Sequence, residues 1–138
     1  MLPEPHTLNP APAAVTLHTA AGLRFAMDWS TWQPRDRAVL CFVRCDGRLL
    51  LIHKKRGLGA GRYNGPGGRI EPGETPVAAA VRETQEELRV TPTGLREAGR
   101  LRFAFVDGYG IDCHVFTASG LAGEPAETDE AVPFWCAA

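Results

Sequence analysis

Residues 68–90 constrain the fold of this chain more than any other segment, because they combine a helix signature with three closely spaced carboxylates. Thr75 can cap a helix N-terminus and Pro76 suits the first helical position, so the sequence predicts a helix over residues 76–88. Apolar and small residues recur along it at helical spacing and are expected to form its buried face. These residues are Val77, Ala80, Val81, Thr84 and Leu88.

The three carboxylates belong to Glu83, Glu86 and Glu87, which fall off this buried stripe. Side chains three or four residues apart on a helix are neighbours, and like charges at that spacing repel by roughly 0.2–0.5 kcal/mol per pair. The cluster has two interpretations, an ordinary solvated acidic face or a site for a divalent cation. Ligands that are all oxygen favour Mg²⁺, with Mn²⁺ as a substitute.

The spacing of charged residues and glycines around this helix resembles the Nudix box, G-x5-E-x7-R-E-U-x-E-E-x-G-U, in which U is a bulky aliphatic residue. Two positions depart from the box. Thr84 stands where an aliphatic residue is usual, and Arg89 stands where Gly is usual, which costs about 1 kcal/mol if the left-handed helix end is kept. Neither change removes a charged group. The matching residues are Gly68, Glu74, Arg82, Glu83, Glu86, Glu87 and Val90.

The resemblance covers roughly residues 36–136 and extends to the MutT-homologue hydrolases of oxidised purine nucleotides. It implies an α+β fold, the Nudix α/β/α sandwich around a mixed central sheet. Relatives normally continue past the position of Trp135 into a closing helix, which is expected to be absent from this chain. The further matching segments are residues 54–68, 101–106, 112–116 and 123–130.

The activity implied by the resemblance is a magnesium-dependent pyrophosphohydrolase. It would convert oxidised purine nucleoside triphosphates such as 8-oxo-dGTP to a monophosphate and pyrophosphate. Arg82 would pair with Glu86 and orient it for catalysis. Glu74 would help to orient the ligands or simply close a turn, and Glu130 would be an outer ligand, the base or a solvated loop acid. The implied metal ligands are Glu83, Glu86, Glu87 and the carbonyl of Gly67.

The Gly-rich segment before the box is expected to approach phosphates closely, because Gly permits unusual backbone dihedrals. Lys54 and Arg56 precede it on one face of a strand and can meet phosphates. Asn64 offers a donor and an acceptor to a purine edge. Phe103 and Phe105 alternate onto one strand face, which is usually core but lies along the base pocket in the family. Weaker pocket candidates are Leu58, Tyr63 and Ile111.

The remaining elements follow from local patterns. Residues 1–26 are rich in Pro and Ala and are interpreted as an N-terminal extension with a hairpin over residues 15–26, which leaves residues 27–138 as the hydrolase domain. An Asp-Gly pair predicts a turn between the first two strands of that domain. The predicted strands are residues 38–43, 48–53, 100–106 and 111–117, with a last strand beginning at residues 134–135.

Composition narrows the class of protein. The chain has 138 residues, 44% hydrophobic and 22% charged, which suits one globular domain. The net charge of −1 shows no basic excess, so no polymeric nucleic-acid partner is expected. No apolar run approaches the roughly 20 residues of a membrane span. The four cysteines lack C-x-x-C spacing and no secretion signal is evident, so a cytoplasmic location is expected. The oligomeric state is left open.

Two other functions stay open at this stage. One is a Nudix hydrolase of nucleotide sugars or dinucleoside polyphosphates, against which the segment 54–68 argues. The other is a non-catalytic nucleotide-binding module, against which the full set of box carboxylates argues.

Overall fold

The chain divides into two compact units, residues 1–33 and residues 34–138. The boundary of the hydrolase domain between residues 26 and 27 stays a prediction. The computed structural model describes residues 14–18, 20–22 and 24–138.

An antiparallel hairpin forms the described part of the first unit. Its strands are β1 (Ala14–His18) and β2 (Arg24–Asp28), close to the hairpin predicted from the sequence. Trp29 and Trp32 follow it and pack edge to face, with ring centroids 5.4 Å apart. Residues 1–13 of the predicted extension lie outside the described residues.

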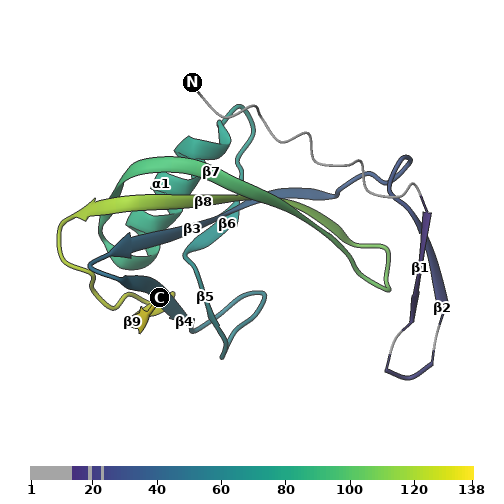
Figure 1. The fold of residues 1–138 in the computed structure, drawn as a ribbon, viewed down its shortest axis with the longest axis horizontal. Helices are drawn as coiled ribbons and strands as arrows, with labels where there is room; N and C mark the ends of the chain where they lie inside the picture. Colours follow the sequence, from purple (N-terminus) through teal and green to yellow (C-terminus); the bar gives the residue numbers. More distant parts are fainter. Residues whose placement is uncertain (1–13, 19, 23) are drawn as a thin grey trace. The chain divides into compact units, whose positions relative to one another are not determined.

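The second unit is built on a seven-stranded mixed sheet with β3 near its middle, which confirms the predicted α+β fold. The strand order is β5-β4-β3-β8-β7, with β6 also pairing with β3 and β9 with β4 (Figure 1). Among the strand pairs of the described residues 34–138, only β3–β8 is parallel. The strands are β3 (Asp36–Cys45), β4 (Arg48–Lys54), β5 (Tyr63–Asn64), β6 (Gly67–Arg69), β7 (Thr91–Ala104), β8 (Gly110–Ala122) and β9 (Ala131–Ala137).

Local chemistry explains the turn between β3 and β4. Asp46 and Gly47 both have positive φ, 51° and 70°, as an Asp-Gly hairpin turn requires. The strands β7 and β8 are longer than predicted, since their pairing extends to Thr91 opposite Ala122. Strand β5 and the first two residues of β6 lie in the segment predicted as a Gly-rich loop, residues 57–68. The two strands have two and three residues, too few to show a hydrophobic alternation.

The helix α1 (Pro76–Leu88) has the predicted bounds. The Thr75 hydroxyl accepts a hydrogen bond from the amide of Ala78 at 3.2 Å and caps its N-terminus. At the other end Arg89 has φ 58° and ψ 30°, and its amide donates to the carbonyl of Gln85. Arg89 therefore adopts the left-handed conformation that usually selects Gly.

The face that α1 buries differs from the prediction at both ends of the helix. Val77 is predicted on the buried face, but its side chain is 45% exposed. It lies in the first turn of α1, and the buried residues of the helix begin at Ala79. Glu87 falls off the predicted buried stripe, yet its side chain is only 3% exposed. The cause is that α1 also lies against β6, the short strand that pairs with β3, and β6 covers the acidic side of the helix (Figure 1).

The hydrophobic core lies between α1 and one face of the sheet. Its members include Val39, Cys41, Val43, Leu50, Ile52, Leu88, Val90 and Phe116. No helix among the described residues is both long and apolar enough to cross a membrane.

Candidate active site

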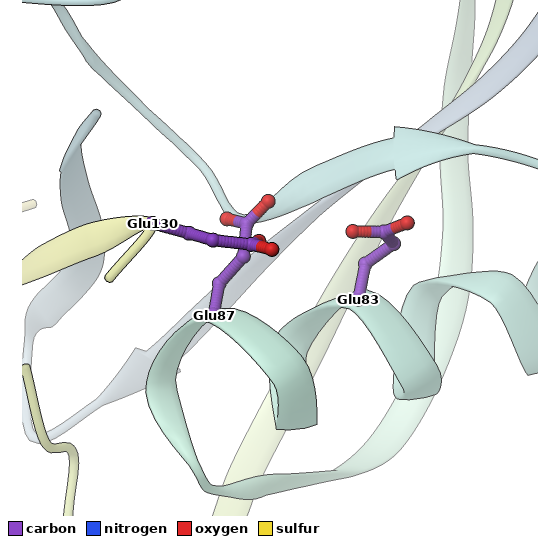
Figure 2. Close-up of side chains that lie close together, drawn as sticks. All are labelled: Glu83, Glu87 and Glu130. Carbon is purple, nitrogen blue, oxygen red and sulfur yellow. The ribbon is translucent and has the colours of Figure 1, made fainter. Parts of the chain in front are cut away.

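Three carboxylates meet where α1 passes the segment before β9. Glu83 and Glu87 come from successive turns of α1 and Glu130 from the residue before β9, and all three point toward one another (Figure 2). One carboxylate oxygen from each lies within 4.8 Å of the others. A Cβ at Gly68 would lie 2.5 Å from the Glu83 carboxylate, so only Gly lets β6 pass this closely.

This acidic cluster carries more negative charge than its surroundings neutralise. Burial, and then the charge of Glu83, raises the pKa of Glu87 to about 8, while Lys54 and hydrogen bonding to the Gly67 backbone only partly oppose the shift. Burial also raises the pKa of Glu83. Within the described residues, Oε2 of Glu87 is buried without a hydrogen-bond partner. A divalent cation would satisfy both the orphaned oxygen and the charge, and an all-oxygen donor set fits Mg²⁺ or Mn²⁺.

Arg82 holds a second set of carboxylates beside the cluster. Its guanidinium donates two hydrogen bonds to Glu74, at 2.8 and 2.9 Å, and one to Glu83 at 2.8 Å. Glu74 also accepts from the amide of Glu71 at 3.0 Å. The hydrogen bonds from Arg82 and from this amide hold the pKa of Glu74 down at about 2. Arg82 thus ties the loop before α1 to a carboxylate of the acidic cluster.

Glu86, another predicted metal ligand, lies beside Arg82 on the exposed side of α1. Its side chain is 51% exposed and lies 3.3 Å from the Arg82 guanidinium, which is the pairing expected from their i,i+4 spacing. Glu86 is not among the three residues whose oxygens converge, and Glu130 takes the third place instead.

The loop that carries Glu130 is fastened to the C-terminal end of α1. The Thr128 hydroxyl donates to the carbonyl of Glu87 at 2.7 Å, and the amide of Ala126 donates to the carbonyl of Leu88 at 3.0 Å. These bonds satisfy carbonyls that a helix end leaves unpaired. They also bring a residue 43 positions from Glu87 into the cluster, and no local sequence pattern marks this approach.

A cavity of about 480 Å³ lies on the sheet face opposite α1. Alternate residues of a strand face opposite sides. Cys41 and Val43 of β3 accordingly pack in the core, whereas Ala38 and Leu40 line the cavity. Gly67 and Gly68 also line it and connect it with the acidic cluster. The predicted substrate-binding residues that line it are Lys54, Leu58, Asn64, Phe103, Phe105 and Ile111.

A family model described as the NUDIX domain matches residues 34–137, which is almost the whole of the second unit. The chain belongs to the NUDIX domain family. Two members of the acidic cluster, Glu83 and Glu87, and the Arg82 side chain lie in the segment that resembles the Nudix box, whereas Glu130 lies outside it.

Relatives of this NUDIX domain include two with a named activity. The chain is 47% identical over 97 residues to an oxidized purine nucleoside triphosphate hydrolase of Danio rerio, covering 70% of the chain and 62% of the relative. It is 43% identical over 89 residues to the protein of the same name from Mus musculus, covering 64% of the chain and 57% of the relative. The match therefore spans less than two thirds of the length of either relative.

The fold is likewise shared with solved structures. The crystal structure of a MutT NUDIX hydrolase from Burkholderia pseudomallei superposes with a TM-score of 0.70 at 29% identity, covering 76% of this chain and 84% of that one.

Two predicted substrate-binding residues of the NUDIX domain lie outside the cavity. Arg56 is exposed and lies 3.3 Å from Glu130. Tyr63 is exposed and packs between His53 and Phe134, with ring centroids 4.9 and 5.2 Å apart. The cavity also has polar lining residues that the sequence analysis missed, because strand alternation alone does not show which face is hollow. These residues are Asp36, Arg69 and Tyr109.

Proposed function

We propose that this NUDIX domain is a magnesium-dependent nucleotide pyrophosphohydrolase that acts on oxidised purine nucleoside triphosphates such as 8-oxo-dGTP. The observation that carries the proposal is the continuity between the acidic cluster and the cavity, through Gly67 and Gly68. A polyphosphate can lie at the cluster while the attached base enters a cavity with aromatic and polar walls. The names of the two relatives support this substrate class.

The carboxylate ligands in this proposal all come from α1. They are Glu83 and Glu87, whose oxygens converge with that of Glu130, and Glu86, which directly precedes Glu87 and is exposed. The Gly67 carbonyl completes the proposed set. When bound, Mg²⁺ neutralises phosphate charge and lowers the pKa of a coordinated water. Mn²⁺ has similar ligand preferences and would substitute.

The residues around the cluster would position the reacting groups. Arg82 fixes the carboxylate of Glu83 and is itself fixed by Glu74, so the ligands need little reorganisation when a cation binds. The Lys54 ammonium donates to the carbonyl of Leu58 at 2.7 Å and lies on the cavity wall, where it can approach a phosphate. Glu130 is the proposed base because it reaches the cluster from outside α1.

In the proposed reaction water attacks one phosphorus, and the bond to the bridging oxygen breaks. A nucleoside monophosphate and pyrophosphate are released, and the proton of the water passes to a carboxylate. Phe103 and Phe105 supply rings that can stack on a base, and Asn64 supplies a polar edge. The net charge of −1 favours free nucleotides over nucleic acid polymers as substrates, and we place the enzyme in the cytoplasm.

A substrate panel tests this function. The purified protein is incubated with 8-oxo-dGTP, dGTP, ADP-ribose and diadenosine polyphosphates, with Mg²⁺ or with EDTA. We expect the highest kcat/KM for 8-oxo-dGTP, pyrophosphate among its products, and no turnover in EDTA. Preferred hydrolysis of ADP-ribose or the diadenosine compounds would assign the site to another substrate class. Nucleotide binding without turnover would make it a binding module.

A further inference from the structure

Asp36, at the start of β3, is a polar residue of the cavity that the sequence motif does not include. It pairs across the sheet with Ile111 of β8, and Ile111 pairs with Phe103 of β7. Residues directly opposite on neighbouring strands project from the same face. Asp36 therefore stands in one transverse row with two apolar residues of the cavity wall, and all three line the cavity.

Two neighbours orient the Asp36 carboxylate. The hydroxyl of Tyr109 donates to its Oδ2 at 2.5 Å, and Nε of Arg69 lies 3.5 Å from the same oxygen. The Tyr109 ring packs against Phe105, with centroids 5.6 Å apart. Among the described residues, no hydrogen bond is made to the other oxygen, Oδ1. The carboxylate is thus held in place with an acceptor left for a ligand.

The position of Asp36 along β3 sets it apart from the acidic cluster. Leu40 of β3 pairs with Gly67, next to the cluster, and Asp36 lies four residues earlier on the same strand. A strand rises by about 3.3 Å per residue, so the two positions are separated by ~13 Å along the cavity wall. A nucleotide with its phosphates at the cluster would extend its base toward Asp36.

An ionised carboxylate only accepts hydrogen bonds. Guanine and 8-oxoguanine present two adjacent donors, N1–H and the 2-amino group, which a carboxylate can engage together. Adenine presents an acceptor, N1, beside its 6-amino group, and that acceptor would face a carboxylate oxygen. A site built to accept from two donors disfavours a base that lacks them.

We propose that Asp36 is a specificity-determining residue that selects 2-amino-6-oxopurines by accepting from N1–H and the 2-amino group, with Tyr109 and Arg69 as positioning residues. The proposal rests on the proposed function, because it takes the cavity as the base site. It adds a residue that decides which base is accepted.

The test compares the variant Asp36→Asn with the wild-type protein. Asn keeps the size and can keep the contact with Tyr109, but replaces one acceptor by a donor. We expect kcat/KM for 8-oxo-dGTP and dGTP to fall about 10- to 100-fold, mainly through KM, while that for dATP stays level or rises. Tyr109→Phe should shift the same ratio by a smaller factor. Glu124→Gln, which removes the same charge from an exposed loop, should leave the ratio unchanged.

Calorimetric binding of 8-oxo-dGMP and dAMP separates this proposal from the proposed function, because it does not require turnover. If Asp36→Asn abolishes a wild-type preference for 8-oxo-dGMP, the proposal holds even for a protein that hydrolyses no triphosphate. If the folded variant keeps the wild-type preference, or if the wild-type protein shows none, the proposal is wrong even when 8-oxo-dGTP is hydrolysed. Circular dichroism checks that the variant is folded.

Discussion

Glu74 and Glu87 belong to the same sequence motif and have opposite electrostatic surroundings. Glu74 receives two hydrogen bonds from Arg82, and its pKa is held at about 2. Glu87 is buried beside Glu83, and its pKa is raised to about 8. The chain itself stabilises the charge of Glu74, but it leaves the charge of Glu87 in excess.

This contrast divides the box into two parts with different requirements. The Arg82–Glu74 pair is complete in the protein alone and fixes the loop before α1. The acidic cluster is unfavourable for folding in isolation and becomes favourable when a cation joins it. Like-charged residues gathered at a cost to stability are typical of functional sites, where that cost is retained for binding or catalysis.

The largest expected effect is that of Glu87→Gln on turnover. The substitution removes one ligand charge from the cluster and leaves the size of the side chain unchanged. We expect kcat to fall on the order of 10³-fold or more, equivalent to about 4 kcal/mol of barrier, at saturating Mg²⁺. Steady-state rates for 8-oxo-dGTP measure it, and Glu124→Gln serves as a charge-matched control. Unchanged turnover would contradict the metal assignment.

The second prediction concerns the stability of the metal-free protein against pH. The folded-state pKa of Glu87, about 8, lies above the ordinary value of 4.5, so the folded protein binds more protons than the unfolded chain between these values. The free energy of unfolding should therefore fall as pH rises from ~4.5 to ~8, by up to a few kcal/mol, because one pKa unit corresponds to about 1.4 kcal/mol. The raised pKa of Glu83 acts in the same direction.

Thermal melts in EDTA measure this dependence. Glu87→Gln cannot lose this proton, so we expect it to match the wild-type Tm near pH 5 and to exceed it near pH 8. Added Mg²⁺ should raise the Tm of the wild type and have little effect on the variant. A variant less stable than the wild type at pH 8 in EDTA would show that the cluster is not a source of strain.

The third prediction concerns the Arg82–Glu74 pair and uses the variant Glu74→Gln. Arg82 then loses its strongest partner and is free to rotate away from Glu83. Residues that support metal ligands typically contribute 10- to 100-fold to metal affinity or activity. We expect a loss of that size in the Mg²⁺ concentration dependence of turnover. Glu71→Gln is the control, since Glu71 is exposed and lies 3.9 Å from Arg82. Equal losses in both variants would remove the special role of Glu74.

The sequence predicts the local contacts of α1 better than it predicts which side chains are buried. The bounds of α1 and its Thr75 cap follow from local chemistry, and both predictions are confirmed. Arg89 keeps the left-handed helix end although it stands where Gly is usual. The pairing of Arg82 with Glu86 follows from helical spacing and is confirmed as well. Interactions within a few turns of chain are thus predictable from residue types and their spacing.

The depth of burial is not predictable in the same way. Glu87 falls off the apolar stripe of α1, and it is buried because segments distant in the sequence, β6 and the loop before β9, lie against it. Asp36 was missed for a similar reason. It joins Ile111 and Phe103 only through the parallel pairing of β3 with β8, a contact about 75 residues apart in sequence.

The smallest expected effect is that of Asn64→Ala. Asn64 lines the cavity proposed to hold the base and lies outside the box. Its Oδ1 already accepts from the amide of Gly65 at 2.8 Å, so chiefly its amide nitrogen is available to a base. We expect Asn64→Ala to lower the preference for purine over pyrimidine triphosphates by about 3- to 10-fold, the value of one exposed hydrogen bond. Competition assays with both classes at saturating Mg²⁺ would measure it. The Mg²⁺ dependence should not change, because the cluster binds phosphates whatever the base. An equal loss for every base would mean that Asn64 supports the loop through Gly65 and does not take part in base recognition.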